Sequence, residues 1–235
     1  MQLILSHLRR ACEQYNLIDD GDKIAVGVSG GKDSLVLLKT LKMFSKFSPK
    51  KFEIIGISVD MFNGKSDFSK ISQWCKENEI EYHVINSDIY EIVFEIRKEK
   101  SPCSLCSKLR RGILCSEIKK LGCNKLALGH TADDLVDTFF LSLFYEGRIS
   151  TIKPKSFMSR TGITVIRPLI LMDEKDIILE ANSLPVIKNL CPEDKYTKRE
   201  FVRNYINNVN EDIPKAKEMV FSAIINTEKY NLLDK

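Results

Sequence analysis

The chain has 235 residues, 43% of them hydrophobic, which is enough to bury one sizeable core. No apolar run approaches the roughly 20 residues that a membrane-spanning helix needs, and seven cysteines, an odd number, argue against a secreted disulfide framework. The net charge of +4 permits nucleic-acid binding without indicating it. We therefore expect a soluble cytoplasmic protein with no membrane segment.

Short apolar segments alternate with helical patterns from the N-terminal part of the chain onward. The predicted strands are 23–28, 52–60, 80–85 and 125–129, and the predicted helices are 33–46, 66–78, 106–121 and 131–145. This alternation predicts an α/β fold with a doubly wound, mostly parallel sheet that helices cover on both faces. Ligands of such sheets bind at the carboxyl ends of the strands, where the strand order reverses.

The second half of the chain is less regular. A further strand is predicted at 163–169, after a loop that carries four basic residues, Arg148, Lys153, Lys155 and Arg160. Beyond Asp173 the pattern becomes helical, and two helical patterns near 197–208 and 214–229 follow. We expect residues 1–190 to form an α/β domain that includes an N-terminal helix. Residues 191–235 are expected to form a short helical C-terminal extension.

The run GVSGGKDS, Gly27–Ser34, begins in the last two residues of the first predicted strand, and SGGKDS follows directly after that strand. Gly30 and Gly31 let backbone N–H groups approach an anion, and the following helix directs its positive end at the same place. The run is not a Walker A loop, because Asp33 stands where that loop requires Ser or Thr. A carboxylate beside phosphate oxygens predicts a magnesium ion between them. An ordinary strand-to-helix turn built with glycines is the alternative.

The run SGGKDS resembles the Ser-Gly-Gly-x-Asp-Ser motif of the PP-loop ATP pyrophosphatases. The resemblance implies that ATP is cleaved between its α and β phosphates and that AMP passes to a substrate oxygen. It assigns ATP binding to the whole run: Ser29, Gly30, Gly31, Lys32, Asp33 and Ser34.

The run LGHTADD follows the fourth predicted strand and is a second candidate for nucleotide chemistry. By the same resemblance, Gly129, His130 and Asp133 contact ATP, and Asp133 or Asp134 joins Asp33 at the magnesium ion. Asp133 and Asp137 are also one helical turn apart. A solvated acidic helix face is therefore the alternative for this run.

Cys103 and Cys106 form a Cys-x-x-Cys pair at the start of a predicted helix. The positive helix end and the cations of Lys108, Arg110 and Arg111 favour thiolates there. By itself, the pair is compatible with zinc, a redox dithiol or an iron–sulfur site.

The remaining cysteines fall into two groups. Four of them have apolar neighbours in helical contexts and are predicted to be small buried side chains: Cys12, Cys75, Cys115 and Cys123. Cys191 lies instead in a loop before Pro192, a place suited to metal ligation.

Several motifs in a fixed order extend the resemblance over roughly residues 20–191: PCSLCSKLRRGIL, LALGHTADD, LFYEG, VIRPLI and EKDI. Together they resemble the tRNA 2-thiocytidine synthetase branch of the PP-loop tRNA-modifying enzymes. The resemblance implies a 4Fe-4S cluster held by Cys103, Cys106 and Cys191, with a fourth iron that lacks a protein ligand.

The implied reaction is an exchange of oxygen for sulfur on tRNA. ATP adenylylates the C2 carbonyl oxygen of a pyrimidine, for which cytidine 32 of tRNA is expected, and sulfur then displaces AMP. Asp33, Cys103, Cys106 and Cys191 are the expected catalytic residues. An external sulfur donor, either a cysteine desulfurase or sulfide, is implied, and so is a homodimer.

Two basic segments are candidates for RNA contact. Arg110 and Arg111 follow the cysteine pair, and the second segment contains Lys195, Lys198, Arg199 and Arg203. The run KREFVRNYI resembles the basic helix that follows the catalytic core in related tRNA enzymes. A solvated helix with an apolar inner stripe is the alternative.

Two other functions remain open at this level. Another PP-loop enzyme, such as a lysidine synthetase or a thiouridine synthetase, activates the same kind of carbonyl. A non-catalytic RNA-binding protein stabilised by zinc uses the cysteines without using the glycine loop. Metal analysis of anaerobically prepared protein distinguishes a thiolase from an RNA-binding protein. A thiolase is expected to contain iron and labile sulfide, and the binding protein is expected to contain zinc.

Overall fold

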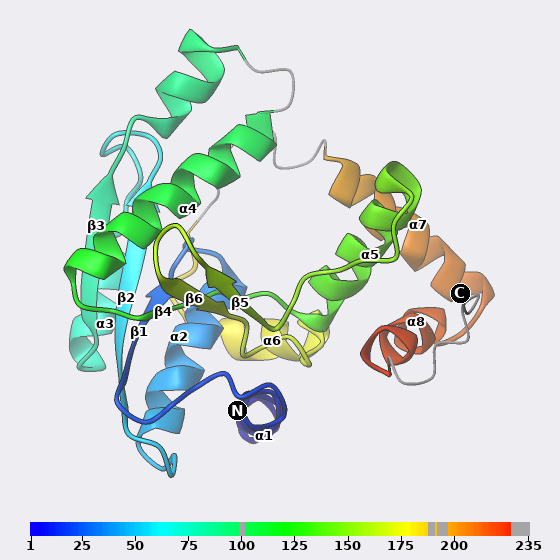
Figure 1. Ribbon diagram of the computed structural model, residues 1–235, viewed down its shortest axis with the longest axis horizontal. Helices are drawn as coiled ribbons and strands as arrows, with labels where there is room; N and C mark the ends of the chain where they lie inside the picture. Colours follow the sequence, from blue (N-terminus) through cyan, green and yellow to red (C-terminus); the bar gives the residue numbers. More distant parts are fainter. Residues whose placement is uncertain (99–101, 188–190, 192–196, 227–235) are drawn as a thin grey trace. The chain divides into compact units, whose positions relative to one another are not determined.

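The computed structural model describes residues 1–98, 102–187, 191 and 197–226. Its elements in chain order are α1 (Gln2–Gln14), β1 (Asp22–Gly27), α2 (Lys32–Ser45), β2 (Phe52–Asp60), α3 (Ser69–Glu77), β3 (Glu81–Asn86), the π-helix η1 (Glu91–Ile96), α4 (Pro102–Lys120), β4 (Lys125–Ala127), α5 (Ala132–Glu146), β5 (Lys155–Met158), β6 (Ile163–Ile166), α6 (Glu174–Ala181), α7 (Lys198–Asp212) and α8 (Ala216–Ile225). Figure 1 shows these elements along the chain. No helix in the described part of the chain combines the length and apolar character that a membrane crossing requires.

The strands form one sheet in the order β3-β2-β1-β4-β6-β5. Every neighbouring pair is parallel except β5 and β6. The predicted doubly wound α/β fold is therefore confirmed. Because β1 lies between β2 and β4, the strand order reverses beside β1, and the loops after β1 and β4 begin at neighbouring strand ends.

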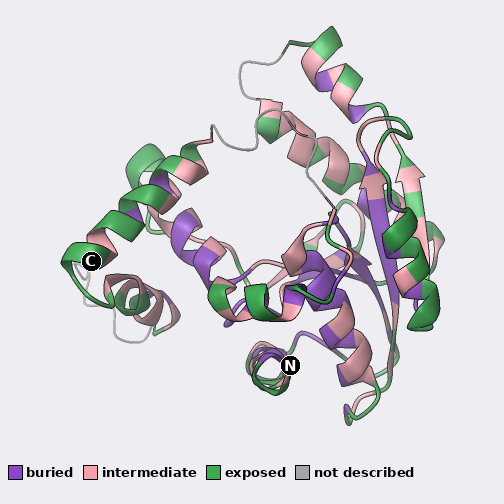
Figure 2. Ribbon diagram, turned by 180° about the vertical axis from the view of Figure 1, so that it is seen from behind, coloured by how far each residue is buried: buried purple, intermediate pink, exposed green. Residues whose placement is uncertain are grey.

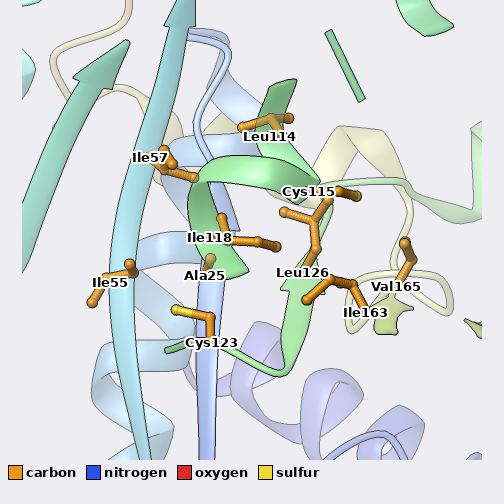
Figure 3. Packing of buried hydrophobic residues seen from close by; sticks show 10 residues of the cluster. All are labelled: Ala25, Ile55, Ile57, Leu114, Cys115, Ile118, Cys123, Leu126, Ile163 and Val165. Atoms are coloured by element: carbon orange, nitrogen blue, oxygen red, sulfur yellow. The ribbon is translucent and has the colours of Figure 1, made fainter. Parts of the chain in front are cut away.

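The two faces of the sheet are covered by different helices. On one face, α4 packs Leu114, Cys115 and Ile118 against strand residues of β1, β2, β4 and β6 (Figure 3). On the other face, α2 approaches β2 at Gly56, where a Cβ atom would lie 3.3 Å from Leu38 Cδ2 and 2.9 Å from Tyr82 Cδ2. A side chain at position 56 would overlap with Tyr82 of β3 and press against Leu38 of α2.

Burial follows the position of each strand in the sheet. The central strand β4 is fully buried, whereas the edge strand β3 alternates between exposed and half-buried residues, as Figure 2 shows. Cys12, Cys75, Cys115 and Cys123 are all buried, which confirms the interpretation of these four as core side chains. Burial raises the pKa of Cys12 to about 12 and that of Cys75 to about 11, so both remain neutral thiols.

Three elements differ from the sequence prediction. Residues 155–158 form the antiparallel strand β5, where a basic loop was expected. Helix α4 begins at Pro102, four residues before the predicted start, because proline fits the first turn of a helix, where its missing N–H is not needed. The π-helix η1 at 91–96 was not predicted.

The chain forms two compact units, and their boundaries differ from the predicted domains at 1–190 and 191–235. The first unit consists of the described residues of 1–131 and 153–191. The second contains α5, the residues up to Ile152, α7 and α8. Helix α5 belongs to the second unit because its side chains make ion pairs and ring contacts with α7 and α8.

A buried ammonium group ties the start of β4 to the start of β1. Lys125 is 4% exposed, and its Nζ lies 2.6 Å from Asp22 Oδ2 and 2.7 Å from Asp19 Oδ2. The same Nζ donates to the carbonyl oxygen of Leu17 at 2.9 Å. The two carboxylates and the carbonyl oxygen compensate the buried charge of Lys125. Removal of the ammonium group would leave the carboxylates without their cation.

We predict that Lys125→Met lowers the free energy of unfolding by about 3 kcal/mol, because Asp22 then remains buried without its cation. Denaturant unfolding measures the change. As a control, Lys120→Met removes a cation that is 67% exposed and pairs with Glu117, and it is expected to cost less than about 1 kcal/mol. Equal losses for the two variants would contradict this account of Lys125.

Candidate active site

The loop between β1 and α2 is held in shape by two serines. Ser34 Oγ accepts hydrogen bonds from the backbone N of Ser29 and from Ser29 Oγ, both at 3.2 Å, and donates to the carbonyl oxygen of Gly31 at 2.8 Å. Ser29 Oγ accepts from the backbone N of Gly31 at 3.3 Å. Gly30 has φ of +86°, a conformation that favours glycine. These bonds fix a turn that ends at the N-terminus of α2, where an anion binds favourably.

Lys32 and Asp33 open α2, and both lie near a carboxylate from a distant part of the chain. Lys32 Nζ is 3.3 Å from Asp33 Oδ2 and 2.5 Å from Glu174 Oε1. Burial alone lowers the pKa of Lys32, but the hydrogen bond to Glu174 and the charges of both carboxylates outweigh it and raise the pKa. Lys32 is therefore a permanent cation. Sequence reasoning did not single out Glu174, although it lies in the run EKDI.

The loop after β4 lies against the loop after β1. A Cβ atom on Gly129 would be 2.9 Å from the carbonyl carbon of Asp33 and 3.1 Å from the backbone N of Ser34. Only a glycine permits this separation of the two backbones. The structure thus brings together the two runs that the sequence identified, SGGKDS and the start of LGHTADD, and it places His130 directly beside the contact.

We predict that Gly129→Ala lowers ATP affinity by about tenfold or more, because the two loops must separate by a few tenths of an ångström or more to admit the methyl group. Isothermal calorimetry with ATP and magnesium measures the effect. Gly112→Ala on α4 is the control, since a methyl group at position 112 would have no neighbour within 4 Å. Unchanged affinity in Gly129→Ala would rule out a nucleotide site at this contact.

The cysteines form a second candidate site in the same unit. Cys106 and Cys191 line one small apolar pocket together with Met61, Phe62, Ile89, Tyr90 and Phe94. Cys106 Sγ lies 3.4 Å from Met61 Sδ. Cys103, one turn before Cys106 on α4, is exposed and close enough for its charge to influence Cys106. The three predicted ligands therefore lie in one neighbourhood.

Aromatic rings form one wall of this pocket. The rings of Phe62 and Tyr90 have centroids 5.1 Å apart, and Tyr90 and Phe94 stack at 4.8 Å. Phe94 belongs to η1, and single π-helical turns are frequent at functional sites. Residues 61–62 and 89–90 follow the carboxyl ends of β2 and β3, so the pocket lies at the same edge of the sheet as the glycine loop.

The sequence predicts thiolate character for Cys106, whereas the surroundings of this thiol on balance raise its pKa. Burial raises the pKa of Cys106, the Arg110 cation opposes this, and the charges of Cys191 and Cys103 raise it further. Mutual repulsion of thiolates is relieved by a bound cation. Within the described residues, no three side chains have the spacing that holds a single metal ion. The donor set of soft sulfur atoms in an apolar pocket fits a cluster of several irons, which spreads its ligands more widely.

The second unit contains the predicted magnesium ligands of α5 and the predicted RNA-binding residues of α7. Asp134 Oδ1 is 2.9 Å from Arg199 Nη1, and Asp137 Oδ2 is 2.8 Å from Arg203 Nη2. Asp133 forms an ion pair with Lys217 of α8. The carboxylates of α5 thus compensate the cations of α7 and α8. The sequence signal for this pairing is a pair of carboxylates three residues apart on α5 and a pair of arginines four residues apart on α7.

The remaining basic candidates have different surroundings. Lys198 Nζ lies over the ring of Tyr145 at 4.4 Å from its centroid. Arg111 is exposed on α4, and Arg110 is half-buried. Arg167, which sequence reasoning did not single out, has its pKa lowered to about 10 by burial and by the Arg111 charge. Two guanidinium groups that repel each other favour a bound anion between or beside them.

The fold and these two sites define a PP-loop ATP-binding protein, and a PP-loop domain model matches residues 4–210. The chain belongs to this PP-loop family and, within it, to the tRNA-cytidine(32) 2-sulfurtransferase family. It is 37% identical over 236 residues to tRNA-cytidine(32) 2-sulfurtransferase 1 of Francisella tularensis subsp. tularensis (strain WY96-3418), with 99% of this chain and 88% of the relative covered.

A second relative agrees with this family, and a solved structure agrees with the fold. The tRNA-cytidine(32) 2-sulfurtransferase of Acinetobacter baumannii (strain ACICU) is 35% identical over 240 residues, which cover 99% of this chain and 80% of the relative. Among solved structures, the U34-tRNA thiolase NcsA from Methanococcus maripaludis, determined with its [4Fe-4S] cluster, superimposes with a TM-score of 0.78. It is 24% identical and covers 99% of this chain and 81% of its own, which supports the fold.

Proposed function

We propose that this protein is an ATP-dependent tRNA sulfurtransferase that replaces the C2 oxygen of cytidine 32 by sulfur. The observation that carries the proposal is the presence of a PP loop and a cysteine pocket at one edge of one sheet. One site activates a carbonyl oxygen, and the other handles sulfur. The relatives named above have this activity in their names.

The ATP half of the reaction uses the loop after β1. Backbone N–H groups at the start of α2 and the Lys32 ammonium bind the phosphates, and Asp33 holds a magnesium ion that shields its carboxylate from them. The C2 oxygen of the pyrimidine attacks the α phosphorus, the α–β bond breaks, and pyrophosphate leaves. The oxygen is then part of AMP, a far better leaving group than oxide.

We predict that Asp33→Ala abolishes release of AMP and pyrophosphate and leaves the thermal unfolding midpoint nearly unchanged, because loss of a half-buried carboxylate at a helix N-terminus costs only about 0.3–1 kcal/mol. Asp212→Ala, which removes an exposed carboxylate at the end of α7, is the control and should retain full turnover. Production of ADP and phosphate by the unsubstituted chain would exclude PP-loop chemistry.

For the sulfur half, we propose that Cys103, Cys106 and Cys191 hold a 4Fe-4S cluster. When bound, the cluster supplies an iron that carries the incoming sulfur. The apolar wall of Phe62, Tyr90 and Phe94 limits the access of water to Cys106 and Cys191, and Arg110 offsets the negative charge of the ligand set. An external donor, a cysteine desulfurase or sulfide, provides the sulfur.

We predict that alanine at Cys103, Cys106 or Cys191 removes most of the iron and labile sulfide from anaerobically prepared protein, because three ligands cannot be reduced to two without loss of the cluster. Cys75→Ala and Cys123→Ala are the controls, since both thiols are buried in the core. Iron analysis and visible absorbance report the result. A full cluster in Cys191→Ala would show that the third ligand is another residue.

The substrate is proposed to be the anticodon loop of tRNA in the cytoplasm. A single-stranded loop base can be unstacked and inserted into a protein site. Arg111 and the nearby Arg167 are suited to the phosphate backbone, and Lys198 is an exposed cation in the second unit. Arg199 and Arg203 are less available, since each pairs with a carboxylate of α5. A homodimer is proposed from the family resemblance.

We predict that tRNA from cells lacking the gene loses 2-thiocytidine and regains it with the unsubstituted gene but not with the Cys106→Ala copy. Nucleoside analysis by mass spectrometry measures the modification. Because Cys106 lines the pocket and Cys12 is buried in the core, a Cys12→Ala copy is the control and should restore it. Loss of a thiouridine would keep the mechanism and change the substrate, whereas unchanged thionucleosides would refute both.

A further inference from the structure

One stretch of the first unit contacts the phosphate-binding loop at two points and leads to Cys191. It comprises α6 and the residues that follow it up to Ile187, and we call residues 174–187 the strap. Helix α6 packs against α2, the helix that the loop opens. The strap therefore contacts one candidate site and precedes Cys191 of the other along the chain.

The first contact is the ion pair of Glu174 with Lys32. The two side chains are 23% and 29% exposed, and the 2.5 Å separation makes a charge-assisted hydrogen bond. At the other end of α6, Glu180 pairs with Lys39 of α2 at 2.6 Å. The two ion pairs are alike in chemistry and in the helices they join. They differ in two ways: the Glu174 pair involves a residue of the glycine loop motif, and Glu180 also pairs with the N-terminal ammonium of Met1 at 3.1 Å.

The second contact joins the backbones. Ile187 N donates a hydrogen bond to the carbonyl oxygen of Gly30 at 3.0 Å. The Ile187 side chain also occupies the space where a Cβ atom of residue 30 would lie. Because the loop backbone and Ile187 are in direct contact, a displacement of one requires a displacement of the other.

Cys191 follows Ile187 by four residues. Four trans peptide steps extend at most about 15 Å, so the position of Ile187 limits the position of Cys191. Cys191 in turn lines the pocket that contains Cys106. A movement of Ile187 therefore shifts the region that Cys191 can reach.

We propose that the strap couples nucleotide occupancy of the loop to the position of Cys191, with Glu174 as the positioning residue. The coupling rests on the ATP-binding part of the proposed function. Triphosphate oxygens and the Glu174 carboxylate compete for the Lys32 ammonium and repel each other. Nucleotide therefore releases Glu174 from Lys32, weakens the bond between Ile187 and Gly30, and frees Cys191 to move.

The test measures the full-length chain with and without a non-hydrolysable ATP analogue and magnesium. Hydrogen exchange reports the Ile187 amide, and alkylation of the iron-free chain by iodoacetamide reports Cys191 relative to Cys103. With the analogue, we expect exchange at Ile187 and alkylation of Cys191 to accelerate by about fivefold or more. Glu174→Gln should show the accelerated rates without nucleotide and respond no further to it.

Glu180→Gln is the control, because it removes the ion pairs with Lys39 and with the Met1 N-terminus from the same helix and leaves the loop motif untouched. It should behave as the unsubstituted chain does. Calorimetry on each protein measures nucleotide binding separately from the response of Ile187 and Cys191. If the unsubstituted chain binds the analogue and both rates stay constant, or if Glu180→Gln behaves as Glu174→Gln does, the coupling is overturned. Absence of nucleotide binding to the unsubstituted chain would refute the proposed ATP site and the coupling with it.

Discussion

The close approach of two backbones at Gly129 is the constraint on which the candidate nucleotide site depends. Parallel strands β1 and β4 are neighbours, so their following loops start side by side. Contact between the loops requires that residue 129 carry no side chain, because a Cβ atom there would overlap with Asp33. The buried Lys125 ammonium fixes the opposite ends of the same two strands through Asp22. The site is thus held by the sheet from which both loops emerge.

Charge is organised differently in the two units. In the first unit, Lys32 lies between Asp33 and Glu174 and forms an ion pair with each of them. In the second unit, three carboxylates of α5 pair with cations of α7 and α8. These pairs stabilise the packing of three helices, and they reduce the positive charge available to RNA on α7.

The cysteines divide according to their surroundings. Four are buried in the packed core, and desolvation keeps them as neutral thiols. Cys106 and Cys191 line an apolar pocket with aromatic walls at the edge of the sheet. A cysteine side chain can therefore be part of the inert core or a candidate ligand. The difference is whether it lines a pocket that several sulfur atoms share.

The sequence by itself determined the parallel α/β architecture, the glycine loop at the end of the first strand and the family of the protein. These features depend on local periodicity and on motifs of adjacent residues, which the chain carries whatever its packing. Tertiary structure alone decided the pairing of Lys32 with Glu174, the association of α5 with α7 and α8, and the proximity of Arg111 to Arg167. Each joins residues more than fifty positions apart, and the partner of a charged side chain is set by which surfaces pack together, a property that spacing along the chain does not contain.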